Sequence, residues 1–151
     1  MDTQMKRLQI DTGVQEFQIN DGGILRFNPS DPNVYNRFFC ATEEVGKIDE
    51  ELAKEVSALQ EDDVEGALKS LKRADTKVKA LLNDVFGLDN DFNQILGGVN
   101  LMAAGNNGKR VILNLFEALS PVFECGAKRC ADAKLASAKM NREQRRAMNK
   151  K

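Results

Sequence analysis

Residues that commonly perform acid–base chemistry or bind metals are scarce in this chain of 151 residues. It contains no histidine, the side chain most used for proton transfer near neutral pH and the commonest nitrogen ligand of zinc, copper and non-haem iron. Ser–His–Asp triads, Cys–His pairs and HExxH zinc sites are therefore excluded. No window of the sequence assembles its carboxylates, lysines and cysteines into a catalytic set. We expect a non-enzymatic protein that uses no cofactor and no metal.

The three cysteines, Cys40, Cys125 and Cys130, do not form a recognisable redox or metal motif. Cys125 and Cys130 are five residues apart, which on a helix places them on different faces rather than in a CxxC clip. We expect all three to be reduced, small and mostly buried side chains.

Two glycine-rich stretches, 97–98 and 105–109, invite comparison with a phosphate-binding loop. Neither follows a predicted strand, and Arg110 stands where the GxxxxGK[ST] motif has Ser or Thr. Nucleotide binding is therefore not predicted. The segment 87–108, rich in glycine and asparagine, is predicted to be a connector with short helical turns.

The charge of the chain is unevenly distributed, although the total is only −1. Residues 1–100 hold 11 basic and 19 acidic side chains, whereas residues 101–151 hold 11 basic and 4 acidic ones. This polarity favours head-to-tail association, an acidic partner or weak contact with nucleic acid, without choosing among them. No apolar run reaches the roughly 18 to 20 residues of a membrane span, and the first residues lack a secretory signal. We expect a cytosolic protein with no membrane contact.

The first organised segment, residues 6–28, is predicted to form β-strands, because apolar and polar residues partly alternate around Leu8, Phe17 and Ile24. Residues 20–23, Asn-Asp-Gly-Gly, tolerate the positive φ angles of a tight turn. The sequence thus predicts an antiparallel hairpin or a three-stranded meander over residues 1–28. So small a sheet needs a helix or a second copy of the chain to cover its apolar face.

Two long helices are predicted over residues 30–86. Ser30 or Asp31 can cap the first, and Pro32 fits its first turn. Apolar residues recur about every 3.5 positions in each helix. They are Val34, Phe38, Ala41, Val45, Ile48, Leu52, Val56 and Leu59 in the first helix, and Val64, Leu68, Leu71, Ala74, Val78, Leu81, Leu82 and Val85 in the second. Residues 61–63 can cap the second helix, which favours a helical hairpin over one continuous helix.

Residues 109–140 are predicted to form a further helix that is bent near Pro121, because Ser120-Pro121 either kinks this helix or starts a new one. Beyond Ala131 the apolar content falls, and residues 141–151 are predicted to be a basic tail, either a short helix or a frayed end. The fold class is accordingly α+β and mostly helical. An N-terminal β-hairpin or meander is followed by a helical bundle and a basic C-terminal tail, with residues 1–140 in a single domain. Because only 6% of the residues are aromatic, we expect a mostly aliphatic core.

Several segments carry a resemblance to a known family. Residues 11–14 (Asp-Thr-Gly-Val), 19–20 (Ile-Asn) and 25–33 (Leu-Arg-Phe-Asn-Pro-Ser-Asp-Pro-Asn) resemble the tail assembly chaperones of long-tailed bacteriophages, in the branch found in phages of Gram-positive bacteria. Looser likenesses lie at 85–87, 97–100 and 114–118. The order and spacing of these pieces carry the resemblance, because Asn-Pro-x-Asp-Pro alone is only a good helix start.

The resemblance implies a non-catalytic protein that binds the tape measure protein and keeps it soluble while tail tube subunits polymerise around it. It implies action in the cytoplasm of the infected host cell, absence from the mature virion, and the tail tube protein as a second candidate partner. Because the tape measure is largely helical, apolar side chains on a chaperone helix can hold it. The candidate partner-binding residues are Val111, Leu115 and Phe116 on the helix 109–140, with Arg142, Arg145 and Arg146 for acidic segments. Core packing of the three apolar residues and simple solvation of the arginines are the competing interpretations.

A homo-oligomer is a further expectation, because the hairpin is sparsely covered and the apolar repeat of the first helix is long. The second interpretation of the whole chain is a nucleic-acid-binding phage protein that acts through its basic C-terminal segment. Such binding would weaken steeply with salt. No aromatic residue follows Phe123 to stack on bases, and the acidic first hundred residues would repel a polyanion, so nucleic acid is the less favoured partner. A third interpretation, an inhibitor of a host protein, has no sequence feature of its own.

Overall fold

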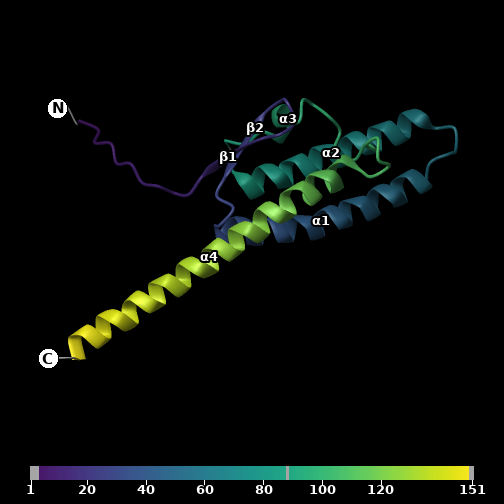
Figure 1. The fold of residues 1–151 in the computed structure, drawn as a ribbon. Coiled ribbons are helices and arrows are strands. Elements are labelled where there is room, and N and C mark those ends of the chain that lie inside the picture. The colour runs from purple at the N-terminus through teal and green to yellow at the C-terminus, as the bar shows by residue number, and fades with distance from the viewer. Residues whose placement is uncertain (1–3, 88, 150–151) are drawn as a thin grey trace.

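The computed structural model describes residues 4–87 and 89–149. In its last helix the side chains of residues 136, 137, 140, 141, 143–145, 148 and 149 lie outside this description. The elements in chain order are β1 (Gln15–Gln18), β2 (Ile24–Phe27), α1 (Pro32–Ser57), α2 (Val64–Phe86), α3 (Phe92–Ile95) and α4 (Val111–Asn149). The predicted class, α+β and mostly helical with an N-terminal hairpin, is confirmed. Figure 1 shows the hairpin and α3 near one end of α2, and the C-terminal half of α4 extending away from the other elements.

The two strands pair antiparallel, from Gln15 opposite Phe27 to Gln18 opposite Ile24. The predicted turn joins them, with the Ile19 N–H donating to the Gly23 carbonyl at 2.9 Å. Of the two alternatives for this segment, the two-stranded hairpin is formed rather than the meander. Residues 4–14 precede it as an extended arm outside any strand.

The helical hairpin has the predicted caps. The Asp31 carboxylate accepts the Asn33 N–H at 2.9 Å, and the Asp63 carboxylate accepts the Gly66 N–H at 2.9 Å. Residues 58–63 separate α1 from α2, so the alternative of one continuous helix is wrong. The Asp63 cap also favours the start of a new helix over continuation of α1, because it satisfies a free N–H group in the first turn of α2.

The apolar repeats of α1 and α2 are buried only where other elements cover them. The positions from Val34 to Leu52 in α1 are buried or half-buried, and so are those from Leu71 to Val85 in α2. Near the loop that joins the helices, Val56, Val64 and Leu68 are exposed instead. The spacing therefore predicted the packing face correctly but not how far along each helix the core extends.

The elements meet in a cluster of phenylalanines. Phe27 of β2, Phe38 of α1, Phe86 of α2 and Phe123 of α4 are all buried, and the Phe38 and Phe123 rings stack with centroids 4.4 Å apart. Phe92 of α3 joins them through Phe86 at 5.3 Å. Most buried residues are aliphatic, as expected, but the contacts between the rings link the sheet to all four helices. Each aromatic pair adds roughly 0.5–1.5 kcal/mol to the stabilisation from burial alone.

The connector between α2 and α4 contains short helical turns, as predicted, and polar side chains hold it against α2. The side-chain amide oxygen of Asn83 accepts the Phe92 N–H at 3.0 Å, and the Asp75 carboxylate accepts the Leu101 N–H at 2.8 Å. Lys79 is buried and bridges Asp75, at 2.9 Å, and Asn93, at 2.8 Å. Polar side chains of α2 and of the connector therefore satisfy backbone and side-chain groups that would otherwise be buried without partners.

The last helix differs from the prediction at Pro121. α4 is assigned as one helix from Val111 to Asn149, so no new helix starts at Ser120, and in Figure 1 its ribbon shows no sharp change of direction. The proline has no N–H to donate to the Glu117 carbonyl, and the Ser120 hydroxyl donates to the neighbouring Phe116 carbonyl at 2.8 Å. Phe116 and Phe123, on either side of the proline, both contact Phe38 and hold the two parts of the helix on the same core. The predicted basic tail is the last part of this helix up to Asn149.

Candidate partner-binding surface

The three apolar candidates, Val111, Leu115 and Phe116, lie in the first turns of α4 and all contribute to the core. Leu115 is buried, while Val111 and Phe116 are half-buried and pack against the core. The Phe116 ring meets the Phe38 ring edge-on, with centroids 5.4 Å apart. A partner can therefore reach only the outer parts of Val111 and Phe116.

Two grooves run along opposite sides of these turns. The first, between α1 and α4, has a volume of about 240 Å³ and is lined by Thr42, Val45, Gly46, Asp49, Met102, Arg110, Ile112, Leu113 and Phe116. The second, between the hairpin turn and α4, has a volume of about 330 Å³ and is lined by Gln18, Ile19, Asn20, Leu96, Val111, Asn114, Leu115 and Ala118. We call them the α1 groove and the hairpin groove. The structure thus divides the three predicted residues between two sites, with Phe116 in one and the other two in the second.

The α1 groove has an apolar wall and a charged rim. Leu113 is 46% exposed beside it. The Arg110 guanidinium lies on the rim, 3.1 Å from the Asp49 carboxylate, and donates to the Met102 carbonyl. Sequence reasoning missed Leu113 because it does not lie on the predicted apolar face of the helix. Its position could have identified it as a candidate partner-binding residue, because an apolar side chain on the polar face of an amphipathic helix does not point into the core.

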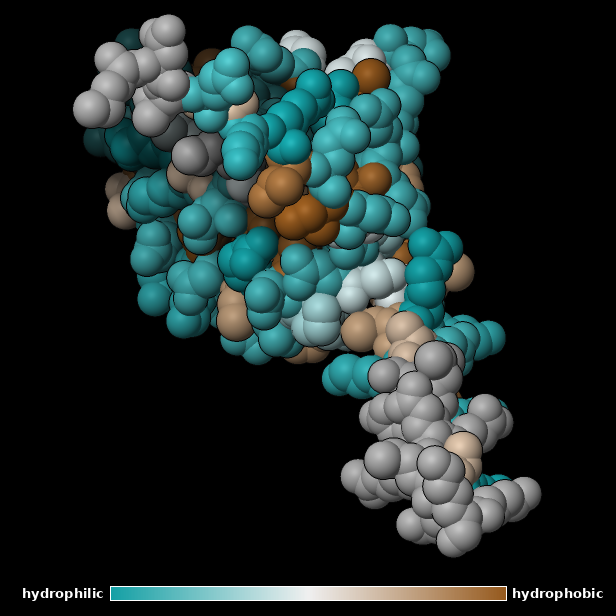
Figure 2. Space-filling model, turned by 90° about the vertical axis from the view of Figure 1, so that its left-hand side faces the viewer, coloured by the Kyte–Doolittle hydropathy of each residue, from teal (hydrophilic) through white to brown (hydrophobic). Residues whose placement is uncertain are grey.

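The arginine candidates lie far from both grooves. Arg142 and Arg146 are exposed near the end of α4, one turn apart on one face of the helix, while the Arg145 side chain lies outside the described residues. At a rise of 1.5 Å per residue, Arg142 is about 39 Å along the helix axis from Phe116. Lys128, Arg129, Lys134 and Lys139 are exposed on the intervening turns. Figure 1 shows this part of the helix projecting from the body of the molecule, and Figure 2 shows hydrophilic side chains where the helix leaves that body. The predicted residues therefore form two separate surfaces, one in grooves and one on a projecting helix.

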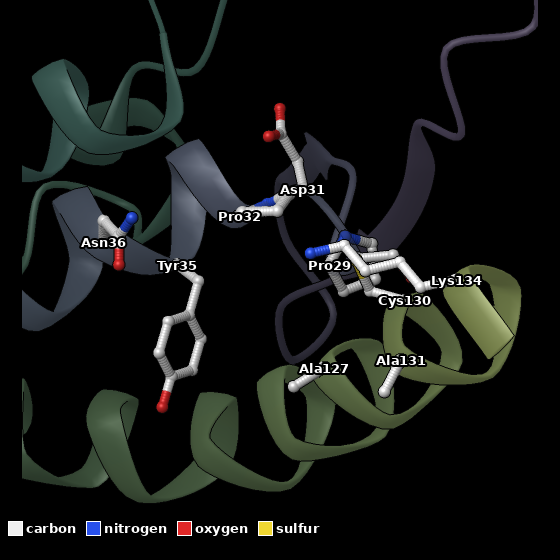
Figure 3. Close-up of a pocket in the computed structure, with 10 residues that line it drawn as sticks. Pro29, Asp31, Pro32, Tyr35, Asn36, Ala127, Cys130, Ala131 and Lys134 are labelled. Carbon is white, nitrogen blue, oxygen red and sulfur yellow. The ribbon is translucent and has the colours of Figure 1, made fainter. Parts of the chain in front are cut away.

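A pocket that the sequence did not predict lies where the start of α1 crosses α4. Figure 3 shows Tyr35 and Asn36 on one side of it and Ala127, Cys130 and Ala131 on the other. Its volume is about 230 Å³, and its remaining lining residues are Pro29, Ser30, Asp31, Pro32 and Lys134. The short side chains of α4 leave this space open. The pocket offers room for a small apolar group.

The backbones of α4 and the α1 start come into close contact beside this pocket. Gly126 of α4 lies against the Pro29 carbonyl, and a Cβ atom at position 126 would overlap with it. The Ser30 hydroxyl is buried nearby without a hydrogen-bond partner in the described part of the chain. Gly126 therefore sets how closely the two elements approach.

The cysteines are free, as predicted, but mostly not buried. Cys40 and Cys125 are exposed and Cys130 is half-buried in the pocket wall. The prediction of mostly buried side chains is wrong because Cys40 and Cys125 lie off the packed faces of α1 and α4. Across residues 4–87 and 89–149, no group of three or more Cys, Asp or Glu side chains is arranged to hold a metal ion.

The surface of the helical hairpin is lined with exposed ion pairs. Glu55 of α1 lies 3.3 Å from Arg73 of α2, and hydrogen bonds from Arg73 and Ser70 hold the pKa of the Glu55 carboxyl below its usual value. The hydrogen bond to Glu44 raises the pKa of Lys47. Such exposed pairs stabilise little individually.

In comparisons with known proteins, no family model, curated protein or solved structure matches the chain. Among the helices that the structure describes, none combines the length and apolar character needed to cross a bilayer.

Proposed function

We propose that this protein is a non-catalytic tail assembly chaperone of a long-tailed bacteriophage. It binds the tape measure protein in the cytoplasm of the infected cell and keeps it soluble while the tail tube assembles, and it is not retained in the virion. The proposal rests on the sequence resemblance over residues 11–33 and on one structural observation. This observation is the pair of apolar grooves that flank the first turns of α4.

The grooves suit short segments of an amphipathic helix. Each is lined mainly by apolar side chains, and the α1 groove is bordered by Arg110 and Asp49, whose charges can orient a polar helix face. At about 240 and 330 Å³, each groove admits only a few side chains, so a single contact is weak. Weak contacts repeated along a long helical chain cover it and still release it, as a chaperone must.

The projecting part of α4 supplies a second type of contact. Arg142 and Arg146 are exposed on one face, and the basic residues before them are also exposed. Their distance of about 39 Å from Phe116 exceeds the reach of a compact partner domain but not that of an extended helical one. We therefore assign the grooves to apolar segments of the partner and the arginines to its acidic segments.

The decisive experiment is co-expression with the tape measure protein, followed by size exclusion with light scattering at low and high salt. We expect soluble tape measure protein only when this chain is present, in a complex of defined mass without nucleic acid. Leu113→Asp places a charge beside the α1 groove and should greatly reduce the soluble complex. Leu68→Asp introduces the same charge at a 60% exposed position on α2 and is the matched control. A tape measure protein that stays insoluble with the wild-type chain would contradict the proposal.

The exposed basic face of α4 supports a second candidate function, nucleic-acid binding. The same chromatography tests it through the ratio of absorbance at 260 and 280 nm. Co-elution with nucleic acid that high salt and the double variant Arg142→Ala/Arg146→Ala both abolish, together with an insoluble tape measure protein, would favour this second function.

A further inference from the structure

The two outer edges of the β-hairpin are treated differently by the rest of the chain. On the β2 side, the Asn90 side chain pairs with the Arg26 backbone, accepting its N–H at 2.9 Å and donating to its carbonyl at 2.8 Å. Asn90 is buried and also donates to the Phe86 carbonyl. Its amide thus takes the place of a third strand at Arg26 and blocks that part of the edge.

The β1 edge has no such cover in the described structure. Arg26 lies opposite Glu16 in the register, and the Arg26 N–H and carbonyl point outward to Asn90. In an antiparallel ladder both members of such a pair point outward, so the N–H and carbonyl of Glu16 face away from β2, and those of Gln18 do so as well. Neither residue donates or accepts a backbone hydrogen bond on that side in residues 4–87 and 89–149. β1 therefore presents a short template for another strand.

The N-terminal arm, residues 4–14, is an extended segment whose apolar side chains lack cover. Leu8 is 85% exposed and Ile10 is 78% exposed, and the two lie on the same face of an extended chain. This is the segment in which the residue pattern predicts a strand. The arm has the residue pattern of a strand, but in the described structure it pairs with no strand of the same chain.

The chain directs the arm away from its own β1. The Asp11 carboxylate accepts the Gly13 N–H at 2.9 Å, and the Asn28 amide donates to the Thr12 carbonyl at 2.9 Å. Gly13 has a φ of +74° and lies so close to Asn28 that a Cβ atom would collide with it. These contacts fix the turn before β1, and Figure 1 shows the arm leading away from the body.

We propose that the arm of one copy pairs as a third strand with the open β1 edge of a second copy. Besides its free backbone groups, two features of the arm match the β1 edge, namely its charge and its apolar face. The arm carries Lys6 and Arg7 and no acidic residue over positions 4–10, whereas positions 14–25 carry Glu16 and Asp21 and no basic residue. Leu8 and Ile10 share one face and would extend the apolar side of the sheet beside half-buried Phe17. The inference does not depend on the identity of the chaperone's client.

The test is the mass of the full-length protein by light scattering and sedimentation from about 5 to 300 μM, at moderate salt. We expect the average mass to rise with concentration above the 16.8 kDa of one chain. Glu16→Pro removes both an outward N–H and the charge and should weaken association by about tenfold or more, whereas Glu16→Thr keeps that N–H, loses only the charge and should weaken association much less. Ile10→Asp should weaken association more than Gln9→Asp does, because Gln9→Asp adds the same charge on the opposite face of the arm and removes no apolar side chain.

A second readout identifies the contact itself. Amide exchange at Glu16, Gln18 and residues 6–10 should slow as the concentration rises. A monomer at every concentration would overturn the proposal, and so would an association that neither Glu16→Pro nor Ile10→Asp weakens. Slow exchange at Glu16 and Gln18 in a monomer would overturn it as well, since it would show that the arm pairs with its own β1. Circular dichroism of each variant separates these outcomes from loss of the fold.

Discussion

The two halves of α4 share one helix but lie in opposite surroundings. The first half places Ile112, Leu115, Leu119 and Phe123 in the core, at spacings of three or four residues. In the second half, every side chain described from Ala131 onward is exposed, including Leu135 at 60%. The change occurs around Gly126, which is the last buried position among those side chains of the helix that the structure describes. A continuous helix therefore does not imply a continuous core.

The two halves are helical for different reasons. Packing of an apolar face stabilises the first half, where Phe123 alone contacts rings from β2, α1 and α2. The second half is rich in alanine, lysine and arginine, which have high helix propensity, and it continues a helix that is already nucleated. The first half stabilises the fold, whereas the second half places basic side chains in solvent.

Phe123→Ala should produce the largest effect and separate the two halves most clearly. Removing a buried ring should lower the free energy of unfolding by about 3–5 kcal/mol, because the cavity would open between Phe38 and Phe27. Leu135→Ala removes an exposed apolar side chain from the second half and should change it by less than about 0.5 kcal/mol. Urea unfolding followed by circular dichroism measures both. Similar losses in the two variants would show that the halves do not differ as described.

Gly126→Ala tests the point at which the surroundings of the helix change. Alanine is the better helix former, but its Cβ would collide with the Pro29 backbone, so we expect a net loss of about 1–3 kcal/mol. Gly46 is also helical, and in the described structure no atom beyond its chain neighbours and the surrounding turns of its own helix backbone lies within 4 Å of where its Cβ would be. Gly46→Ala should therefore stabilise the protein by about 0.5–1 kcal/mol. A gain in stability for both variants would mean that α4 does not approach Pro29 so closely.

Features encoded by neighbouring residues could be predicted from the sequence. The turn at 20–23, the caps Asp31 and Asp63, and the faces of α1 and α2 each depend on residues a few positions apart. The uninterrupted α4 could not be predicted in this way. The residues around Pro121 do not reveal whether the helix continues through it. The helix is held on both sides of the proline by Phe116 and Phe123, which pack on Phe38, and this is a tertiary contact with a residue distant in sequence.

The candidate site was less predictable than the fold for a related reason. Apolar spacing correctly placed Val111, Leu115 and Phe116 on one helix, but which parts remain exposed depends on α1 and the hairpin, which are distant in sequence. The pocket in Figure 3 joins Ser30 to Cys130 across a hundred positions, and no local pattern announces it. Likewise, the pattern around Leu8 indicates a strand but cannot tell which chain provides the partner.

Removing the part of α4 beyond Leu135 should also have a small effect on stability. A chain ending after Leu135 should lose less than about 1 kcal/mol of unfolding free energy, because the side chains described beyond that point are exposed and bury little apolar surface. Urea unfolding measures this loss, and the slope with urea should stay nearly constant, since it follows the surface exposed on unfolding. A loss of several kcal/mol would show that this half is part of the core. If the stability is retained, any loss of binding to the proposed client by the shortened chain would result from removal of the basic surface and not from unfolding.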